Sequence, residues 1–178
     1  MNPWFYLTLL GDPLMWSAIA IAFAVAYLIA SPFMSRGYKK KLRRLLLLLL
    51  PALFITLAVT YGLKYLTMVA RPCVPCPAGA GIQSSVLTSE PLEFCNPYCE
   101  ADYSFPSGHA AAIFAVFTSG LLAFSRKKKY LFLYIIPLLV SYSRLALAVH
   151  APADVLSGAA LGIAVPVLVW KIEKSLRS

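Results

Sequence analysis

A histidine and an aspartate stand four residues apart in an otherwise apolar stretch, SYSRLALAVHAPADVLSG, which covers residues 141–158. Asp154 follows His150 by about one helical turn, so its carboxylate can reach one ring nitrogen, fix the tautomer and leave the other nitrogen free. That arrangement suits a histidine that acts as a nucleophile. Arg144 lies near the end of the preceding apolar run and adds a positive charge that can hold an anion.

Lys64 and Arg71 form a second candidate pair. They are about two helical turns apart, so we expect both charged groups to project from one face of a helix that Pro72 ends. Both would then reach the same anion.

The stretch Phe105-Pro106-Ser107-Gly108-His109 opens the next predicted helix. Free backbone N–H groups at a helix start, together with a serine hydroxyl and a glycine, allow an anion to approach closely. We therefore predict a phosphate-binding cradle that includes Ser107 and Gly108.

The composition indicates which elements must position these residues. Of 178 residues, 60% are hydrophobic and 13% are charged, whereas soluble domains have about 45–50% apolar and about 25% charged residues. The chain is therefore expected to be an integral membrane protein. Five apolar segments approach the roughly 20 residues that a bilayer requires: about Leu14 to Met34, Leu45 to Ala70, Ser107 to Phe124, Tyr130 to Leu147 and Pro152 to Trp170.

The predicted fold is all-α, a polytopic transmembrane helical bundle of about five spans that forms a single domain over residues 1–178. Asp12 followed by Pro13 is typical of a helix start. The preceding ten residues are interpreted as an amino-terminal interfacial helix anchored by Trp4, Phe5 and Tyr6.

Positive charges indicate the orientation. Basic residues stay on the cytoplasmic side of a membrane, and most of them here fall between spans one and two, between spans three and four, and after span five: Arg36, Lys39, Lys40, Lys41, Arg43, Arg44, Arg126, Lys127, Lys128, Lys129, Lys171, Lys174 and Arg177. We expect a multi-pass protein of the cell membrane with an extracytoplasmic amino terminus and a cytoplasmic carboxyl terminus. The net charge of +9 then faces anionic lipid headgroups and does not indicate nucleic-acid binding.

The remaining basic residues, Lys64, Arg71 and Arg144, all lie toward the outer ends of spans, at the level of the only two histidines. Ionisable groups at membrane depth are costly and usually face a bundle interior or a cavity. Their common level predicts one shared extracytoplasmic site.

The loop over residues 71–105 is predicted to be extracytoplasmic and carries every cysteine: Cys73, Cys76, Cys95 and Cys99. A zinc site is one interpretation of this spacing. Two disulfides, with three possible connectivities, are favoured because the compartment is oxidising. Asp102 in this loop could tune His109 or belong to a solvated face.

Gly158 and Gly162 form a GxxxG pattern in span five. Close packing within the bundle explains it as well as dimerisation does. No oligomeric state follows from the sequence.

Three motifs occur in order: Lys64-x6-Arg71-Pro72, Pro106-Ser107-Gly108-His109 and Ser143-Arg144-x5-His150-x3-Asp154. Together they resemble the signature of the type 2 phosphatidic acid phosphatase superfamily, which includes membrane lipid phosphatases, glucose 6-phosphatase, bacterial acid phosphatases and vanadium haloperoxidases. Its membrane members commonly have six spans, whereas five are predicted here. The difference lies at the amino terminus and leaves the site intact.

The resemblance implies a role for each site residue. His150 would attack phosphorus and form a phosphohistidine, Asp154 would orient its ring, and His109 would act as general acid and then general base. Lys64, Arg71, Ser107, Gly108 and Arg144 would hold the phosphoryl oxygens. The sequence has no acidic cluster suited to magnesium, so we predict an enzyme without a metal or other cofactor.

The predicted substrate is a phosphorylated lipid whose tail enters laterally from the bilayer. A polyprenyl diphosphate is favoured, and a phosphatidic acid or phosphatidylglycerol phosphate phosphatase is the close alternative. A protein that binds or transports lipid phosphates without turnover is an alternative of another class. It explains the cations equally well but not the pair of histidines with Asp154.

Overall fold

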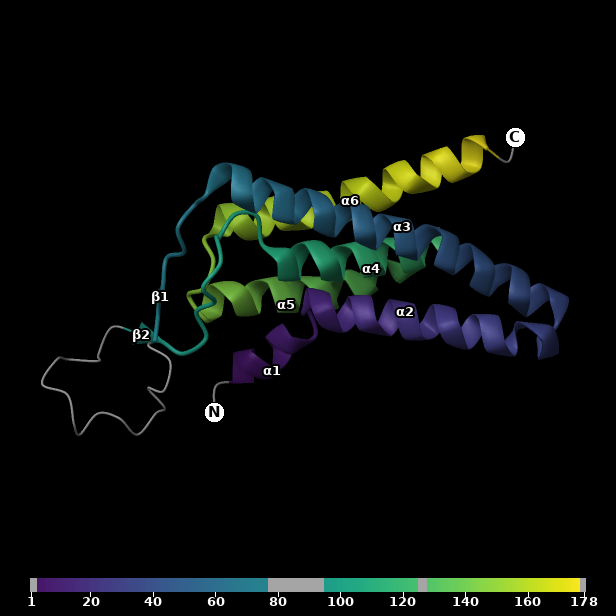
Figure 1. The fold of residues 1–178 in the computed structure, drawn as a ribbon, viewed down its shortest axis with the longest axis horizontal. Coiled ribbons are helices and arrows are strands. Elements are labelled where there is room, and N and C mark those ends of the chain that lie inside the picture. Colours follow the sequence, from purple (N-terminus) through teal and green to yellow (C-terminus); the bar gives the residue numbers. More distant parts are fainter. Residues whose placement is uncertain (1–2, 77–94, 125–127, 177–178) are drawn as a thin grey trace, which may run out of the picture.

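The computed structural model describes residues 3–76, 95–124 and 128–176, and most of this part is helical (Figure 1). The elements in order are α1 (Pro3–Leu9), α2 (Pro13–Ala30), η1 (Ser31–Phe33), α3 (Arg36–Thr67), β1 (Val74–Pro75), β2 (Cys95–Asn96), α4 (Gly108–Phe124), η3 (Lys128–Tyr134), α5 (Ile135–Ala146) and α6 (Pro152–Ser175). The two short strands pair in parallel. They lie at one end of the bundle, whereas the α2–α3 connection and the carboxyl terminus lie at the opposite end (Figure 1).

Helix lengths support the predicted transmembrane bundle. Among the residues that the structure describes, three segments are long and apolar enough to cross a membrane, namely Pro13–Phe33, Arg36–Thr67 and Pro152–Ser175. The shorter apolar helices Gly108–Phe124 and Tyr130–Ala146 match the other two predicted spans. The all-α class is therefore confirmed, and the apolar helices identify a membrane protein.

The start of α2 follows the sequence prediction. Asp12 is the N-cap, and its carboxylate accepts a hydrogen bond of 2.9 Å from the amide of Met15. Pro13 occupies the first helical position, where a backbone N–H would have no acceptor within the helix, so its absence costs no hydrogen bond. The predicted amino-terminal helix also forms, as α1.

The prediction that Lys64 and Arg71 project from one face of the same helix is wrong. Helix α3 ends at Thr67, and Met68 adopts a left-handed conformation with φ of 47° that turns the chain away. Arg71 therefore lies beyond the helix, in the segment that leads to β1. Proline disfavours a helical conformation in the residue before it, so the chain is already extended when it reaches Pro72.

Two other predicted boundaries shift. Helix α3 begins at Arg36 and not at Leu45, because lysine and arginine are good helix formers and continue the helix beyond its apolar part. The predicted span from Tyr130 begins as the 3-10 helix η3, and regular α-helix starts only at Ile135. Pro137 accounts for this start, since proline is tolerated in the first turn of an α-helix but not in its interior.

Helix α4 is the centre of the bundle and packs against α2, α3, α5 and α6. Several of its side chains are small and fully buried, as in Ala110, Ala111, Ala112 and Ala115. Small residues allow neighbouring backbones to approach closely, which is how membrane helices pack without a hydrophobic driving force between them.

The GxxxG pattern of α6 forms a close contact with α4. Gly158 lies directly against the backbone oxygen of Ser107, and a Cβ atom at Gly162 would be 2.5 Å from the carbonyl oxygen of Ala111. Both glycines are buried. Packing within the bundle, which was one of the two interpretations of this pattern, therefore accounts for them.

We predict that Gly162→Ala lowers the free energy of unfolding by about 1–3 kcal/mol, as overpacking does. The added methyl group would meet the Ala111 carbonyl and the Cβ of Phe114, the latter at 2.7 Å. Gly62→Ala in α3 is the matched control, because a Cβ there would meet nothing within 4 Å. Detergent-solubilised protein unfolded by heat or by a denaturing detergent measures both. Equal stability of the two variants would contradict the prediction.

Candidate active site

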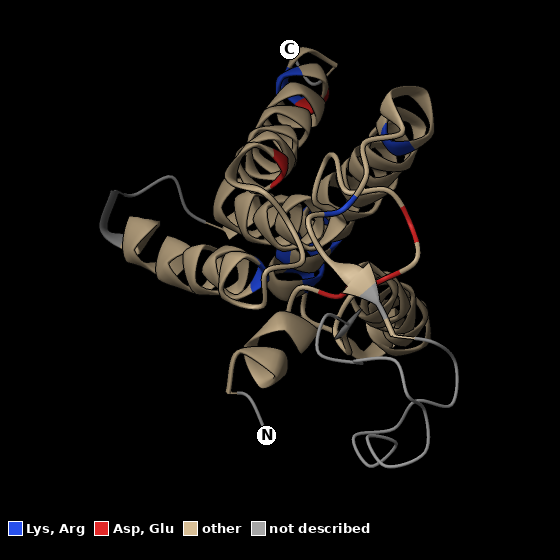
Figure 2. Cartoon of the chain, turned by 90° about the vertical axis from the view of Figure 1, so that its left-hand side faces the viewer, with Lys and Arg blue, Asp and Glu red and all other residues tan. Residues whose placement is uncertain are grey.

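The predicted site residues gather at the end of the bundle that carries β1 and β2. They come from the end of α3 and the segment after it, the start of α4, the end of α5, the α5–α6 connection and the start of α6. Seen from that end, acidic segments of the loop between α3 and α4 lie beside basic segments near the centre of the bundle (Figure 2).

His150 and Asp154 make the predicted contact. Asp154 lies in the first turn of α6, and its Oδ2 accepts a hydrogen bond of 2.8 Å from the amide of Ala151. The same oxygen lies 3.3 Å from Nδ1 of His150. Both side chains are almost fully buried. Because the helix start holds the carboxylate, the carboxylate can hold the imidazole ring.

Ser104 is a third member of this group that the sequence did not indicate. Its hydroxyl donates to Oδ2 of Asp154 and lies 3.3 Å from Nδ1 of His150. Its amide donates to the carbonyl of Val69 at 2.8 Å, which fixes the loop beside the end of α3. A single serine in an irregular loop has no periodicity or spacing that would have pointed to it.

The contacts of His150 define its tautomer. Arg71 donates from one guanidinium nitrogen to Nε2 of His150 at 3.1 Å. A guanidinium group can only donate, so Nε2 is the unprotonated nitrogen and the proton is on Nδ1, facing Asp154. Nε2 is therefore the ring nitrogen with an available lone pair.

Burial of the ring, and after it the positive charge of Arg71, lower the pKa of His150 to about 2. The imidazole is therefore neutral at physiological pH. A neutral ring with an unprotonated Nε2 is the form that a nucleophilic histidine requires.

The three predicted phosphate-binding cations lie together but do not form an open cradle. The Lys64 ammonium lies 2.5 Å from a carboxylate oxygen of Asp102, and Arg71 also pairs with Asp102. Glu100 bridges Arg71 at 2.6 Å and Arg144 at 2.7 Å. Asp102 is 43% exposed, as a solvated face implies, and its side-chain partners are Lys64 and Arg71.

Charge explains why these carboxylates stay ionised. Burial opposes ionisation of Glu100, but the charges of Arg144, His109 and Arg71 outweigh it and lower the carboxyl pKa. Burial also opposes ionisation of Asp102, and hydrogen bonds from Lys64 and Arg71 reverse that effect and lower its pKa.

Other polar groups at the start of α4 and the end of α5 have capacity for a ligand. Within the described residues, Ser107 Oγ and Arg144 Nε are buried and have no hydrogen-bond partner. The Ser107 amide donates to the carbonyl of Asp154 at 2.9 Å, which joins the start of α4 to the start of α6. Gly108 is the first residue of α4 and is buried there.

His109 lies in the first turn of α4, close enough to Glu100 to affect its pKa. The segment between α1 and α2 packs tightly against His109, since a Cβ atom at Gly11 would be 3.2 Å from the Cβ of His109. Thr8 of α1 accepts a hydrogen bond of 2.9 Å from Arg144. The amino-terminal segment therefore supports the site, which the sequence did not indicate.

Cysteine pairing in the loop favours disulfides over zinc. Cys73 and Cys99 form a disulfide, and Cys76 is also disulfide-bonded. The side chain of Cys95 lies outside the described residues, as do Glu90 and Glu93. The described part of the chain contains no cluster of three or more metal-ligating side chains.

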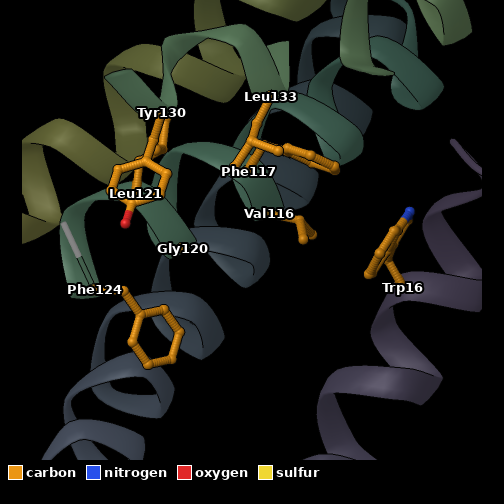
Figure 3. A pocket seen from close by; sticks show the side chains of 8 residues that line it. All are labelled: Trp16, Val116, Phe117, Gly120, Leu121, Phe124, Tyr130 and Leu133. Carbon is orange, nitrogen blue, oxygen red and sulfur yellow. The ribbon is translucent and has the colours of Figure 1, made fainter. Parts of the chain in front are cut away.

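An apolar pocket of about 460 Å³ lies beside the carboxyl-terminal half of α4, and none of the charged site residues lines it. Trp16 of α2 faces the side chains of α4 and η3 across it (Figure 3). Its lining residues are Trp16, Val116, Phe117, Gly120, Leu121, Phe124, Tyr130 and Leu133.

The buried neutral His150 predicts a specific pH dependence of stability. Its ordinary pKa of 6.5 applies in the unfolded chain, which therefore takes up a proton on acidification while the folded protein does not. Stability is then lost as pH falls below about 6.5, by up to about 1.4 kcal/mol per pH unit. His150→Gln removes this contribution. From about pH 7.5 to about pH 5, we expect wild type to lose about 2 kcal/mol more than the variant. Thermal unfolding of both proteins in detergent measures it, and parallel curves would contradict it.

Comparison with known proteins supports the motif analysis. Residues 45–177 match the PAP2 superfamily. An undecaprenyl-diphosphatase of Sulfolobus acidocaldarius is 39% identical over 90 residues, which cover 48% of this chain and 43% of that protein. The chain thus spans less than half the length of the curated relative it matches. No solved structure matches the chain. Since the superfamily match covers most of the chain and includes every motif residue from Lys64 to Asp154, the protein belongs to the PAP2 superfamily.

Proposed function

We propose that the protein is a metal-independent lipid phosphatase that removes a phosphoryl group through a phosphohistidine intermediate. The observation that carries this proposal is the state of His150. Its Nδ1 proton faces Asp154, its Nε2 lone pair lies 3.1 Å from a guanidinium group, and its ring is buried and neutral. A protein that only binds lipid phosphates has no need of such a group.

The first step transfers the phosphoryl group to the enzyme. Arg71, Arg144 and Lys64 hold the phosphoryl oxygens, and Nε2 of His150 attacks phosphorus in line. The bond from phosphorus to the leaving oxygen breaks, and His109 donates a proton to that oxygen. Asp154 balances the positive charge that develops on the imidazole ring.

The second step restores the enzyme. His109, now without its proton, takes a proton from water while the water oxygen attacks phosphorus. The bond to Nε2 breaks, and inorganic phosphate leaves. With a lipid diphosphate as substrate, the products are a lipid monophosphate and inorganic phosphate.

The favoured substrate is a polyprenyl diphosphate, which the name of the Sulfolobus relative supports. The apolar pocket beside α4 offers a place for the tail, because Val116 lies seven residues after His109 and thus about two turns further along the same helix face. Phosphatidic acid and phosphatidylglycerol phosphate remain the alternative substrates.

The site is proposed to face the extracytoplasmic side. Basic residues of the α2–α3 connection and of the end of α6 lie at the opposite end of the bundle from β1 and β2. Basic segments remain cytoplasmic. A disulfide beside the site also suits an oxidising compartment.

We predict that His150→Ala reduces phosphate release by at least about 1,000-fold, the scale of loss when a nucleophile is removed. The measurement uses detergent micelles containing polyprenyl diphosphate, phosphatidic acid or phosphatidylglycerol phosphate. Wild type should turn over one lipid fastest and form an acid-labile phosphoenzyme that the variant lacks. Glu173→Gln, which changes one side chain at the opposite end of the bundle, is the control. If His150→Ala retains turnover, the mechanism is wrong. If wild type binds these lipids without releasing phosphate, the binding or transport alternative stands instead.

A second prediction concerns metal ions. Three fixed cations would supply the charge that magnesium supplies in many phosphoryl-transfer enzymes. We therefore expect the rate of phosphate release to be unchanged in excess EDTA. Loss of activity with EDTA and its recovery with magnesium would contradict the metal-independent mechanism.

A further inference from the structure

Glu100 holds two arginines in the way that a phosphoryl group would. One carboxylate oxygen lies 2.6 Å from Arg71 and the other lies 2.7 Å from Arg144. Carboxylates and phosphates bind guanidinium groups through the same paired, charge-assisted hydrogen bonds. One side chain of the protein thus occupies two of the groups that are proposed to bind substrate.

Asp102 completes this arrangement on the other side of Arg71. It pairs with Lys64 at 2.5 Å and also with Arg71. Each of the three cations therefore has a carboxylate partner from one short segment of the loop, residues 100–102. A phosphoryl group can take up these cations only if the carboxylates release them.

The loop is fastened on both sides of the two acidic residues. The disulfide between Cys73 and Cys99 precedes Glu100 directly, and the Ser104 amide is hydrogen-bonded to Val69. Earlier in the loop, the side-chain amide of Asn96 donates to the carbonyl of Leu147 at 2.7 Å. Such tethering keeps the carboxylates at a high effective concentration near the cations.

The same side chains have a route out to water. The side chains of Glu100 and Asp102 are 40% and 43% exposed, whereas those of Arg71 and Arg144 are only 3% and 2% exposed. A carboxylate displaced by a ligand would be hydrated, and the cations would stay in place. The carboxylates are therefore the part of the cluster that can move.

We propose that Glu100 is an affinity-determining residue that competes with the phosphoryl group for Arg71 and Arg144, with Asp102 in support. This inference rests on the proposed function, because it assumes that these cations bind phosphate. The internal competitor weakens binding of inorganic phosphate, which is the product, and so favours its release.

The first test is the affinity for inorganic phosphate, measured by its effect on thermal unfolding of the detergent-solubilised full chain. Hydrogen bonds to charged groups contribute about 1.5–3 kcal/mol, so we expect Glu100→Gln to lower the Kd for phosphate by roughly 10- to 100-fold. Glu173→Gln is the matched control, with the same change of charge beside Arg44 at the far end of the bundle. It should leave the Kd unchanged. An unchanged or higher Kd in Glu100→Gln overturns the inference.

A second test uses wild type alone, so it holds even if the variant fails to fold. Ligands usually slow hydrogen exchange where they bind. Here phosphate should instead speed exchange of the Ser104 amide, which donates to the carbonyl of Val69 at 2.8 Å, because the carboxylates just before it in the loop lose their partners. Unchanged or slower exchange of this amide on phosphate binding overturns the inference.

These outcomes separate the two proposals. If wild type hydrolyses lipid phosphates but Glu100→Gln binds phosphate no more tightly, the phosphatase proposal stands and the competitor role falls. If neither protein binds phosphate nor releases it from lipids, both fall.

Discussion

Three cations at one end of an apolar bundle require nearby negative charge, and much of the local structure follows from that need. Arg144 is 2% exposed, and burying a charge without a partner is strongly unfavourable. The loop between α3 and α4 supplies the carboxylates, and Thr8 of α1 accepts a further hydrogen bond from Arg144. Segments that would otherwise have little reason to be ordered are thus held by the same cations that are proposed to bind the phosphoryl group.

Arg71 links the binding and the reacting parts of the site. It contacts Glu100 and Asp102 on one side and Nε2 of His150 on the other. A guanidinium group drawn toward a bound phosphoryl group would also leave the lone pair of His150. Binding would then release the nucleophile at the moment when phosphorus comes within reach.

Local contacts could be predicted from the sequence, and contacts across the irregular loop could not. The pairing of His150 with Asp154 and the cap of α2 depend on spacings of three or four residues, which a helix start fixes. The prediction of one helical face for Lys64 and Arg71 was wrong because the helix ends between them. The roles of Glu100 and Ser104 depend on where a loop without periodicity crosses the bundle, and a pattern along the chain carries no information on that.

The close contact between α4 and α6 has a consequence for the membrane around the protein. The carbonyl oxygens of Ser107 and Ala111 lie against Gly158 and Gly162, so the two helices cannot roll or slide past each other independently. Bilayers that are thicker or thinner than the hydrophobic length of a span make its helices tilt. Here α4 must tilt together with α6. The histidine of α4 therefore keeps its position relative to the start of α6, and the site geometry is insulated from differences in membrane thickness.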